Sequence, residues 1–178
     1  QKRPYVAPAE EDVRANIAQW QDLKFGMFIH WGTYSQLGVI ESWTICPELT
    51  EWEYKGRPEG MTYMEYLRFY EHLKDTFNPI HFDPDKWAEA AEYAGMKYVV
   101  FTTKHHDGFN MFDTNLTDYK VTDEGCPFHS NPRSNIAKEV FNSFRAKGLK
   151  AGAYFSIADW HNNDYWWKFF SPKDRYIN

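Results

Sequence analysis

The sequence predicts an α/β protein built on a parallel sheet, for which an open doubly wound sheet and a (β/α) barrel both fit. Strand-like and helix-like segments alternate along the chain, and this alternation is typical of parallel sheets with right-handed crossovers. The helices that lead into the second and third strands each end at a glycine, Gly95 and Gly148. The length of 178 residues suits a single domain.

The chain begins with a predicted helix over residues 10–20. Its apolar residues recur at helical spacing on one face: Val13, Ile17 and Trp20. Residues 24–32, KFGMFIHWG, are rich in aromatic and branched side chains and close on a glycine, so they predict a buried strand that ends near Trp31. Residues 33–60 contain too many breakers for one element, and their aromatic content favours a functional loop.

Two helix starts follow this loop. Thr62 and Glu65 have the spacing of a capping box and predict a helix that ends before the Asn-Pro turn at 78–79. Asp83 as N-cap and Pro84 at the first helical position predict the next helix. The apolar face expected for this helix consists of Trp87, Ala90, Ala91 and Ala94.

The second half of the chain repeats the strand, helix, strand order. Residues 96–106, MKYVVFTTKHH, are dense in β-forming residues and predict a strand. A helix is predicted over 135–147, and one of its faces is apolar: Ile136, Val140 and Phe144. Residues 149–160, LKAGAYFSIADW, then predict another buried strand.

Composition excludes several classes of function. The net charge is −5, from 20 Lys and Arg against 25 Asp and Glu, so neither nucleic acid nor an anionic membrane is expected as a main partner. No apolar stretch approaches the roughly 18 residues of a membrane span. No G-x-G-x-x-G follows a strand and no P-loop is present, so a nucleotide site has no support. Cys46 and Cys126 fit two free thiols or one disulfide equally well.

Histidines gather where the predicted strands end. Four of the seven histidines lie at these ends: His30, His105, His106 and His161. Functional groups of parallel α/β folds lie just past the carboxyl ends of strands, so these imidazoles are expected to face one mouth. Neighbours on a regular strand point to opposite faces, but a break at residues 107–108 would let the adjacent pair reach one pocket. A single histidine of this kind is more often structural.

Carbohydrate binding fits these residues better than metal or nucleophilic chemistry. Zinc sites would need an H-x-H, an H-E-x-x-H or a Cys/His cluster, and a serine nucleophile would need a G-x-S-x-G elbow; the sequence has none of these. Imidazoles donate and accept hydrogen bonds to hydroxyls, and aromatic faces stack on sugar rings. The candidate stacking platforms are Trp43, Trp52, Tyr54 and Trp160. Trp52 and Tyr54 fit a covering role better.

Three segments together resemble the retaining α-L-fucosidases of glycoside hydrolase family 29: FGMFIHWG, FNPIHFDPDKWAEAAEYAGMKYVVFTTKHHDGF, and GLKAGAYFS followed by DW. The match extends over most of residues 24–160. The resemblance implies an irregular TIM-type (β/α) barrel that removes terminal α-L-fucose from fucosylated oligosaccharides or glycoconjugates by double displacement. It implies no cofactor, and a secreted, periplasmic or lysosomal location. Residues 1–12 lack the apolar run of a signal peptide.

The resemblance also implies site residues. Those that would bind fucose or line its pocket are His30, Trp43, His105, His106 and Tyr154; no metal ligand is implied. Ser42 stands before Trp43 where the family has an acid, and Glu41 lies one residue further away, which leaves its role open.

The catalytic carboxyl pair is expected outside the chain. A retaining glycosidase needs two carboxyls about 5–5.5 Å apart, and the resemblance places the nucleophile after the fourth strand and the acid/base further on. Asp107 and Asp159 match neither position. We therefore expect residues 1–178 to be the N-terminal portion of a barrel catalytic domain with three strands, with the pair beyond 178 and no activity alone. The alternatives are a non-catalytic fucose-binding protein and a metal-dependent hydrolase of related shape.

Overall fold

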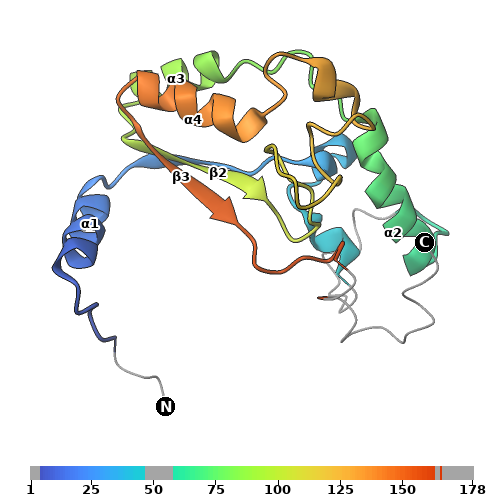
Figure 1. The fold of residues 1–178 in the computed structure, drawn as a ribbon, viewed down its shortest axis with the longest axis horizontal. Coiled ribbons are helices and arrows are strands. Elements are labelled where there is room, and N and C mark those ends of the chain that lie inside the picture. Colours follow the sequence, from blue (N-terminus) through green and yellow to red (C-terminus); the bar gives the residue numbers. More distant parts are fainter. Residues whose placement is uncertain (1–4, 47–57, 163–164, 166–178) are drawn as a thin grey trace.

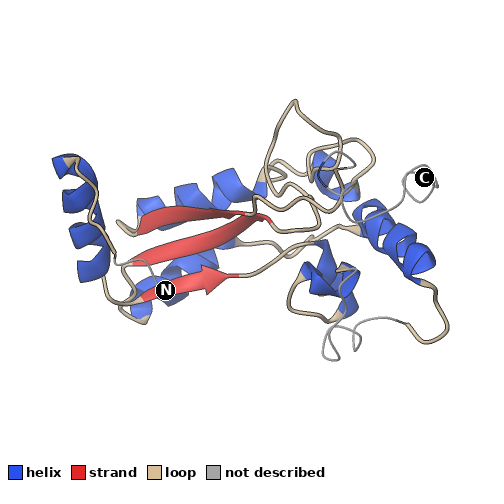
Figure 2. Ribbon diagram, turned by 90° about the horizontal axis from the view of Figure 1, so that it is seen from below, coloured by secondary structure: helices blue, strands red, loops and turns tan. Residues whose placement is uncertain are grey.

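The computed structural model describes residues 5–46, 58–162 and 165. Its strands form one parallel sheet in chain order: β1 (Gly26–Ile29), β2 (Tyr98–Lys104) and β3 (Lys150–Phe155). In Figure 2 the three arrows point the same way, toward a group of loops and short helices. The parallel α/β prediction is confirmed. Among the described residues the sheet is open, with β1 and β3 as its edges.

Helices and 3-10 turns connect the strands. The α-helices are α1 (Glu11–Asp22), α2 (Tyr63–Glu71), α3 (Pro84–Tyr93) and α4 (Ile136–Ala146). The 3-10 turns are η1 (Thr33–Leu37), η2 (Ser42–Ile45), η4 (His72–Thr76) and η5 (Pro127–Ser130). The helix that starts after Thr62 was predicted to end before the Asn-Pro turn at 78–79. The α-helix itself ends at Glu71, and the rest of the segment up to Thr76 is the 3-10 turn η4. None of the described helices is both long and apolar enough to cross a membrane.

The predicted helix starts are confirmed atom by atom. The Thr62 amide donates to Glu65 Oε2 at 2.8 Å, and the Glu65 amide donates to Thr62 Oγ1 at 3.3 Å, which is a complete capping box. Asp83 accepts the Lys86 amide at the start of α3. Gly95 and Gly148 follow α3 and α4 with positive φ, as the C-terminal glycine signal predicted.

Helices α3 and α4 lie together on one face of the sheet (Figure 1). The face of α4 that the sequence predicted is fully buried, and it covers Val99 and Phe101 of β2. The face predicted for α3 is wrong in part: Ala88 and Ala91 are buried, whereas Ala90 and Ala94 are exposed. The buried stripe of α3 is turned because this helix packs chiefly against α4.

The prediction that the first and third strands are buried is wrong for the described residues. Only β2 is largely buried, since it has a strand on each side. Phe28 of β1 and Phe155 of β3 are each 54% exposed. Helices α3 and α4 cover one face of the sheet (Figure 1). Phe28 alternates with Met27 and Ile29, which pack on the core under these helices, so it lies on the other face, edge-on to Tyr154. The expected apolar face of α1 has no buried residue either, and Trp20 is 59% exposed.

A second cluster of buried side chains lies past the carboxyl ends of the strands. It joins η1, η2, α2 and η4, and it consists of Tyr34, Ile45, Cys46, Tyr66, Leu67, Tyr70, Leu73 and Trp160. Cys46 is therefore a core residue here, and Cys126 lies in the core under the helices. Both are free thiols. This second cluster fixes the residues that follow β1, and those residues form part of the site.

Candidate functional site

Three imidazoles meet where β1 and β2 end. The ring centres of His30 and His105 are 4.7 Å apart, and those of His105 and His106 are 4.3 Å apart. Tyr154 at the end of β3 stacks on His105 at 5.7 Å. The structure thus brings together Tyr154 and three of the four histidines that the sequence singled out. The fourth, His161, does not join them: it stacks on Tyr119 at 4.1 Å, and its Nδ1 lies 3.0 Å from a carboxylate oxygen of Glu71. Their roles remain proposals.

Local backbone features hold the histidines in place. Thr102 accepts the Trp31 amide at 3.0 Å and donates to the Trp31 carbonyl at 3.1 Å, which fixes the residue after His30. The pairing of β2 with β3 shifts register between Thr102 and Lys104. This irregularity comes before the predicted break, and it lets His105 and His106 leave the strict alternation of a strand.

Gly108 forms the predicted break itself. Its φ is 80°, and a Cβ at this position would lie 2.5 Å from Asp159 Oδ1 and 2.8 Å from the Cβ of His161. Only glycine fits both the backbone angle and this contact. The turn after β2 therefore lies directly against the loop after β3.

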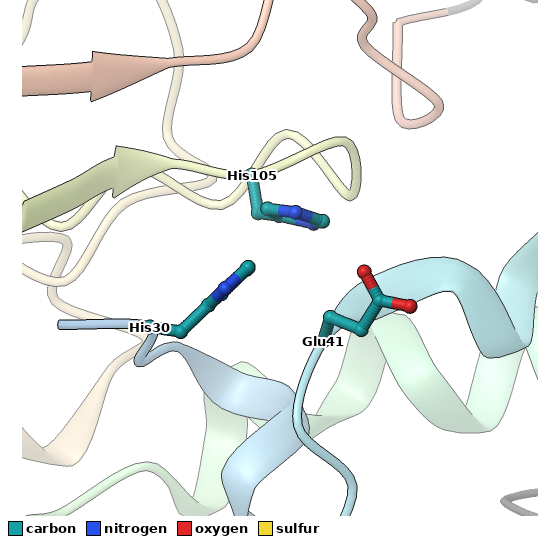
Figure 3. Close-up of side chains that lie close together, drawn as sticks. All are labelled: His30, Glu41 and His105. Carbon is teal, nitrogen blue, oxygen red and sulfur yellow. The ribbon is translucent and has the colours of Figure 1, made fainter. Parts of the chain in front are cut away.

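Glu41 and Ser42 complete the group around His105. One oxygen of Glu41 and one nitrogen from each of His30 and His105 lie within 4.8 Å of one another. Figure 3 shows these three side chains gathered at the strand ends. The Oγ of Ser42 lies 2.6 Å from Nδ1 of His105, and both residues are buried. Sequence reasoning left Glu41 open and missed Ser42. The only signal was their position beside Trp43 in a loop that already carried a site candidate.

Helix α2 positions these two residues through the turn that carries them. The Tyr66 hydroxyl donates to Thr44 Oγ1 at 2.8 Å, and the Tyr63 hydroxyl donates to the Ile45 carbonyl at 2.9 Å. The short turn η2 has no side-chain cap, so these contacts with α2 hold it against the sheet.

The hydrogen bonds of His106 define its tautomer. Ser156 Oγ donates its one proton to the Ala158 carbonyl at 2.9 Å. The same oxygen lies 2.6 Å from Nδ1 of His106, so it accepts there and Nδ1 carries the ring proton. In the neutral ring, Nε2 of His106 is then a hydrogen-bond acceptor only.

Two tryptophans enclose His106. Trp43 meets its ring edge-on at 5.3 Å, and Trp160 lies 4.9 Å from it on another side. Trp160 is 8% exposed, so it supports His106 rather than offering an open face to a sugar. Trp43 is half-buried and keeps its candidacy as a platform. The other two candidates, Trp52 and Tyr54, lie outside the described residues.

Burial keeps the three imidazoles neutral. It lowers the pKa of His30 and of His106, and it lowers the pKa of His105 to about 3, with further contributions from His106 and His30. At neutral pH each ring therefore offers one donor and one acceptor. Neutral imidazoles beside one carboxylate suit a ligand with several hydroxyl groups.

The two aspartates near the strand ends are held by other groups. The Tyr70 hydroxyl donates to Asp107 Oδ2 at 2.8 Å, and burial raises the pKa of Asp107 to about 6. Asp159 forms an ion pair with Lys104 at 3.0 Å, and the lysine side chain is only 5% exposed. Both aspartates thus tie loops together, in keeping with their mismatch to the expected catalytic positions.

The sheet and the site define an α/β protein with a polar, aromatic-lined site at the carboxyl ends of parallel strands. A family model described as Alpha-L-fucosidase matches residues 1–178. The chain therefore belongs to the α-L-fucosidases of glycoside hydrolase family 29, a family of hydrolases.

Individual relatives agree with this assignment. Tissue alpha-L-fucosidase of Homo sapiens is 30% identical over 157 residues, and the match covers 84% of this chain and 31% of the relative. Alpha-L-fucosidase isoenzyme 1 from Paenibacillus thiaminolyticus superposes with a TM-score of 0.66 at 42% identity, over 85% of this chain and 31% of that one. The enzyme AlfC from Lactobacillus casei, in complex with alpha-L-fucose product, has a TM-score of 0.62 at 36% identity, over 83% and 43%. The chain spans 31% of the curated relative's length.

Proposed function

We propose that the protein is a retaining exo-α-L-fucosidase and that residues 1–178 supply its fucose-binding part. The observation that carries this proposal is the group of neutral imidazoles around the Glu41 carboxylate at the ends of parallel strands. In this proposal the three strands are the first of an irregular TIM-type barrel, and the open face of the sheet is its interior. The substrate is a fucosylated oligosaccharide or glycoconjugate.

The residues of the chain bind and orient the sugar. His30, His105, His106 and Glu41 form hydrogen bonds with fucose hydroxyls, Tyr154 lines the pocket and Trp43 contacts the apolar side of the ring. Because the Nε2 atom of His106 only accepts, the hydroxyl opposite it must donate. Fixing the ring in this way supplies the positioning part of catalysis.

The two catalytic carboxyls come from residues outside 1–178 in this proposal. The engagement of Asp107 by Tyr70 and of Asp159 by Lys104 supports this placement, as does the 31% share of the curated relative. The nucleophile attacks the anomeric carbon while the acid protonates the leaving oxygen. This leaves a covalent glycosyl-enzyme intermediate. The group that acted as acid then removes a proton from water while the water oxygen attacks the anomeric carbon and breaks its bond to the nucleophile, which releases fucose with its configuration retained.

Hydrolysis of an aryl α-L-fucoside by the complete protein tests the proposal. We expect release of the aryl group, and proton NMR at early times should show the α-anomer of L-fucose as the first product. A β-anomer would rule out retention. Calorimetric binding of L-fucose without any hydrolysis would instead support the non-catalytic alternative, and neither binding nor hydrolysis would overturn both.

A secreted, periplasmic or lysosomal location is part of the same proposal. Its support is the kind of relative that the chain matches, among them the plasma alpha-L-fucosidase of Homo sapiens, 29% identical over 158 residues.

A further inference from the structure

We propose that His30, Glu41 and His105 also form a binding site for one divalent transition-metal ion, represented by Zn²⁺, and that this ion competes with the sugar. The metal is an inhibitor in this proposal, and hydrolysis does not need it. The competition rests on the proposed function, because both ligands would use the same atoms. The metal site itself rests only on the arrangement in Figure 3.

The donor set is one that zinc prefers. Two imidazole nitrogens and one carboxylate oxygen form the His₂Glu set of catalytic zinc sites, which leave a fourth position for water. The three atoms already lie within 4.8 Å of one another, and bonds of about 2.0–2.1 Å in a tetrahedron would place them roughly 3.4 Å apart. The required contraction is small. His30 is exposed, and its ring already lies 4.7 Å from that of His105.

The surroundings prepare the imidazoles to act as ligands. Metal-bound histidines usually have their second ring nitrogen held by a neighbouring polar group, and Ser42 holds Nδ1 of His105 at 2.6 Å. The Glu41 carboxylate supplies the negative charge that attracts a cation.

Among the described residues, the cation next to the histidine pair in the sequence, Lys104, is paired elsewhere. Lys104, two strand positions before His106, has its ammonium group 3.0 Å from Asp159 and 3.3 Å from the Ala158 carbonyl. His106 itself is not among the residues whose ligand atoms lie within 4.8 Å of one another. This difference between His105 and His106 provides a matched control.

The experiment uses the complete protein in chelator-treated buffer. Zn²⁺ binding is measured by calorimetry, and Co²⁺ binding is measured by its visible absorption, which reports the ligand geometry. We expect one ion per chain. His30→Gln and Glu41→Gln should weaken zinc binding by roughly 10-fold or more, since each removes a ligand. His106→Ala should bind zinc like the wild type although it has lost a sugar contact, and L-fucose should raise the apparent Kd for zinc in the wild type.

Each outcome decides the matter. Equal zinc affinity in Glu41→Gln, His30→Gln and the wild type would overturn the metal site, with circular dichroism showing that both variants fold. Zinc binding that depends on the trio but is unaffected by saturating L-fucose would overturn the competition. Aryl fucoside hydrolysis in the presence of EDTA tests the proposed function separately, so failure of the metal inference and failure of the fucosidase proposal are distinguishable.

Discussion

Ser156 is a small residue with a large effect on the site. Its hydroxyl donates to the Ala158 carbonyl and therefore accepts a hydrogen bond from Nδ1 of His106. Nε2 is then the ring nitrogen of His106 that can accept a hydrogen bond from a ligand. Sequence reasoning chose His106 and overlooked Ser156, because nothing in a serine after a strand indicates that its partner is an imidazole 50 positions earlier.

Replacement of Ser156 by alanine should remove the hydrogen bond that fixes the tautomer of His106. His106 loses its Nδ1 acceptor, and the wrong tautomer becomes available. We expect kcat/KM for an aryl α-L-fucoside to fall by roughly 10-fold, which corresponds to one buried hydrogen bond of about 1–2 kcal/mol. Ser156→Thr keeps the hydroxyl and should retain most of the activity. Equal rates for Ser156→Ala and the wild type would contradict this role.

Alanine at His30 or His106 should have a larger effect. Each change removes a group that orients the sugar, so kcat/KM in the complete protein should drop by about 10²-fold or more. The measurement is steady-state hydrolysis of an aryl α-L-fucoside, with thermal melting as a check on folding. If both folded variants keep near wild-type activity, the placement of fucose beside these imidazoles is wrong.

At the scale of elements, α2 connects the loop of the site to the end of β2. Its tyrosines reach η2 through Thr44 and Ile45, and Tyr70 reaches Asp107 after β2. Asp107 is also within 3.5 Å of Thr33, whose hydroxyl donates to it. A buried carboxyl thus joins α2, η1 and the turn that follows β2.

The stability of this junction should depend on pH. Burial raises the pKa of Asp107 to about 6. Between the ordinary pKa of an aspartate and this value, Asp107 is protonated in the folded protein but ionised in the unfolded chain. The contribution of this carboxyl to stability is therefore full below its ordinary pKa of about 4 and is lost as pH rises through 6. The Tm of the wild type should fall relative to that of Asp107→Asn between pH 5 and pH 7.5. A constant difference between the two Tm values would contradict the raised pKa.

At this scale, the features that the sequence predicted correctly are those set by residues close together along the chain. The box of Thr62 and Glu65 and the cap at Asp83 depend on residues three apart, and both were predicted correctly. The face of α3 depends on α4, which lies far along the chain, and the prediction missed it. Glu41 was left open for a similar reason: its partners His30 and His105 are assembled by the sheet, and no motif spacing expresses their proximity.

At the scale of the whole molecule, the parallel sheet followed from the alternation of strands and helices, and the carboxyl-end rule correctly placed three of the four histidines together. The apolar composition of residues 24–32 predicted a buried strand and missed the exposure of Phe28, whereas the expectation of only three barrel strands already implied open edges and an uncovered face. The apolar composition of a strand indicates that it can pack against other segments, whereas its exposed fraction depends on which segments cover it.

Residues 1–178 expressed alone should unfold without a sharp transition or should aggregate. The sheet has two open edges and one face that the described helices do not cover, and Phe28 is exposed on that face. Scanning calorimetry and light scattering of the isolated segment test this expectation, with the complete protein as the control. A sharp, cooperative melt of a monomeric segment would contradict it.

The long separation of β1 and β2 along the chain delays their pairing during synthesis. Trp31 is held by Thr102, 71 positions later, so β1 has no sheet partner until that residue has left the ribosome. At roughly 5–20 residues per second this takes on the order of 4–14 seconds. During this interval the apolar segment GMFI is available to chaperones or to a neighbouring nascent chain. The rate at which the codons between these two positions are translated therefore sets how long β1 stays unpaired.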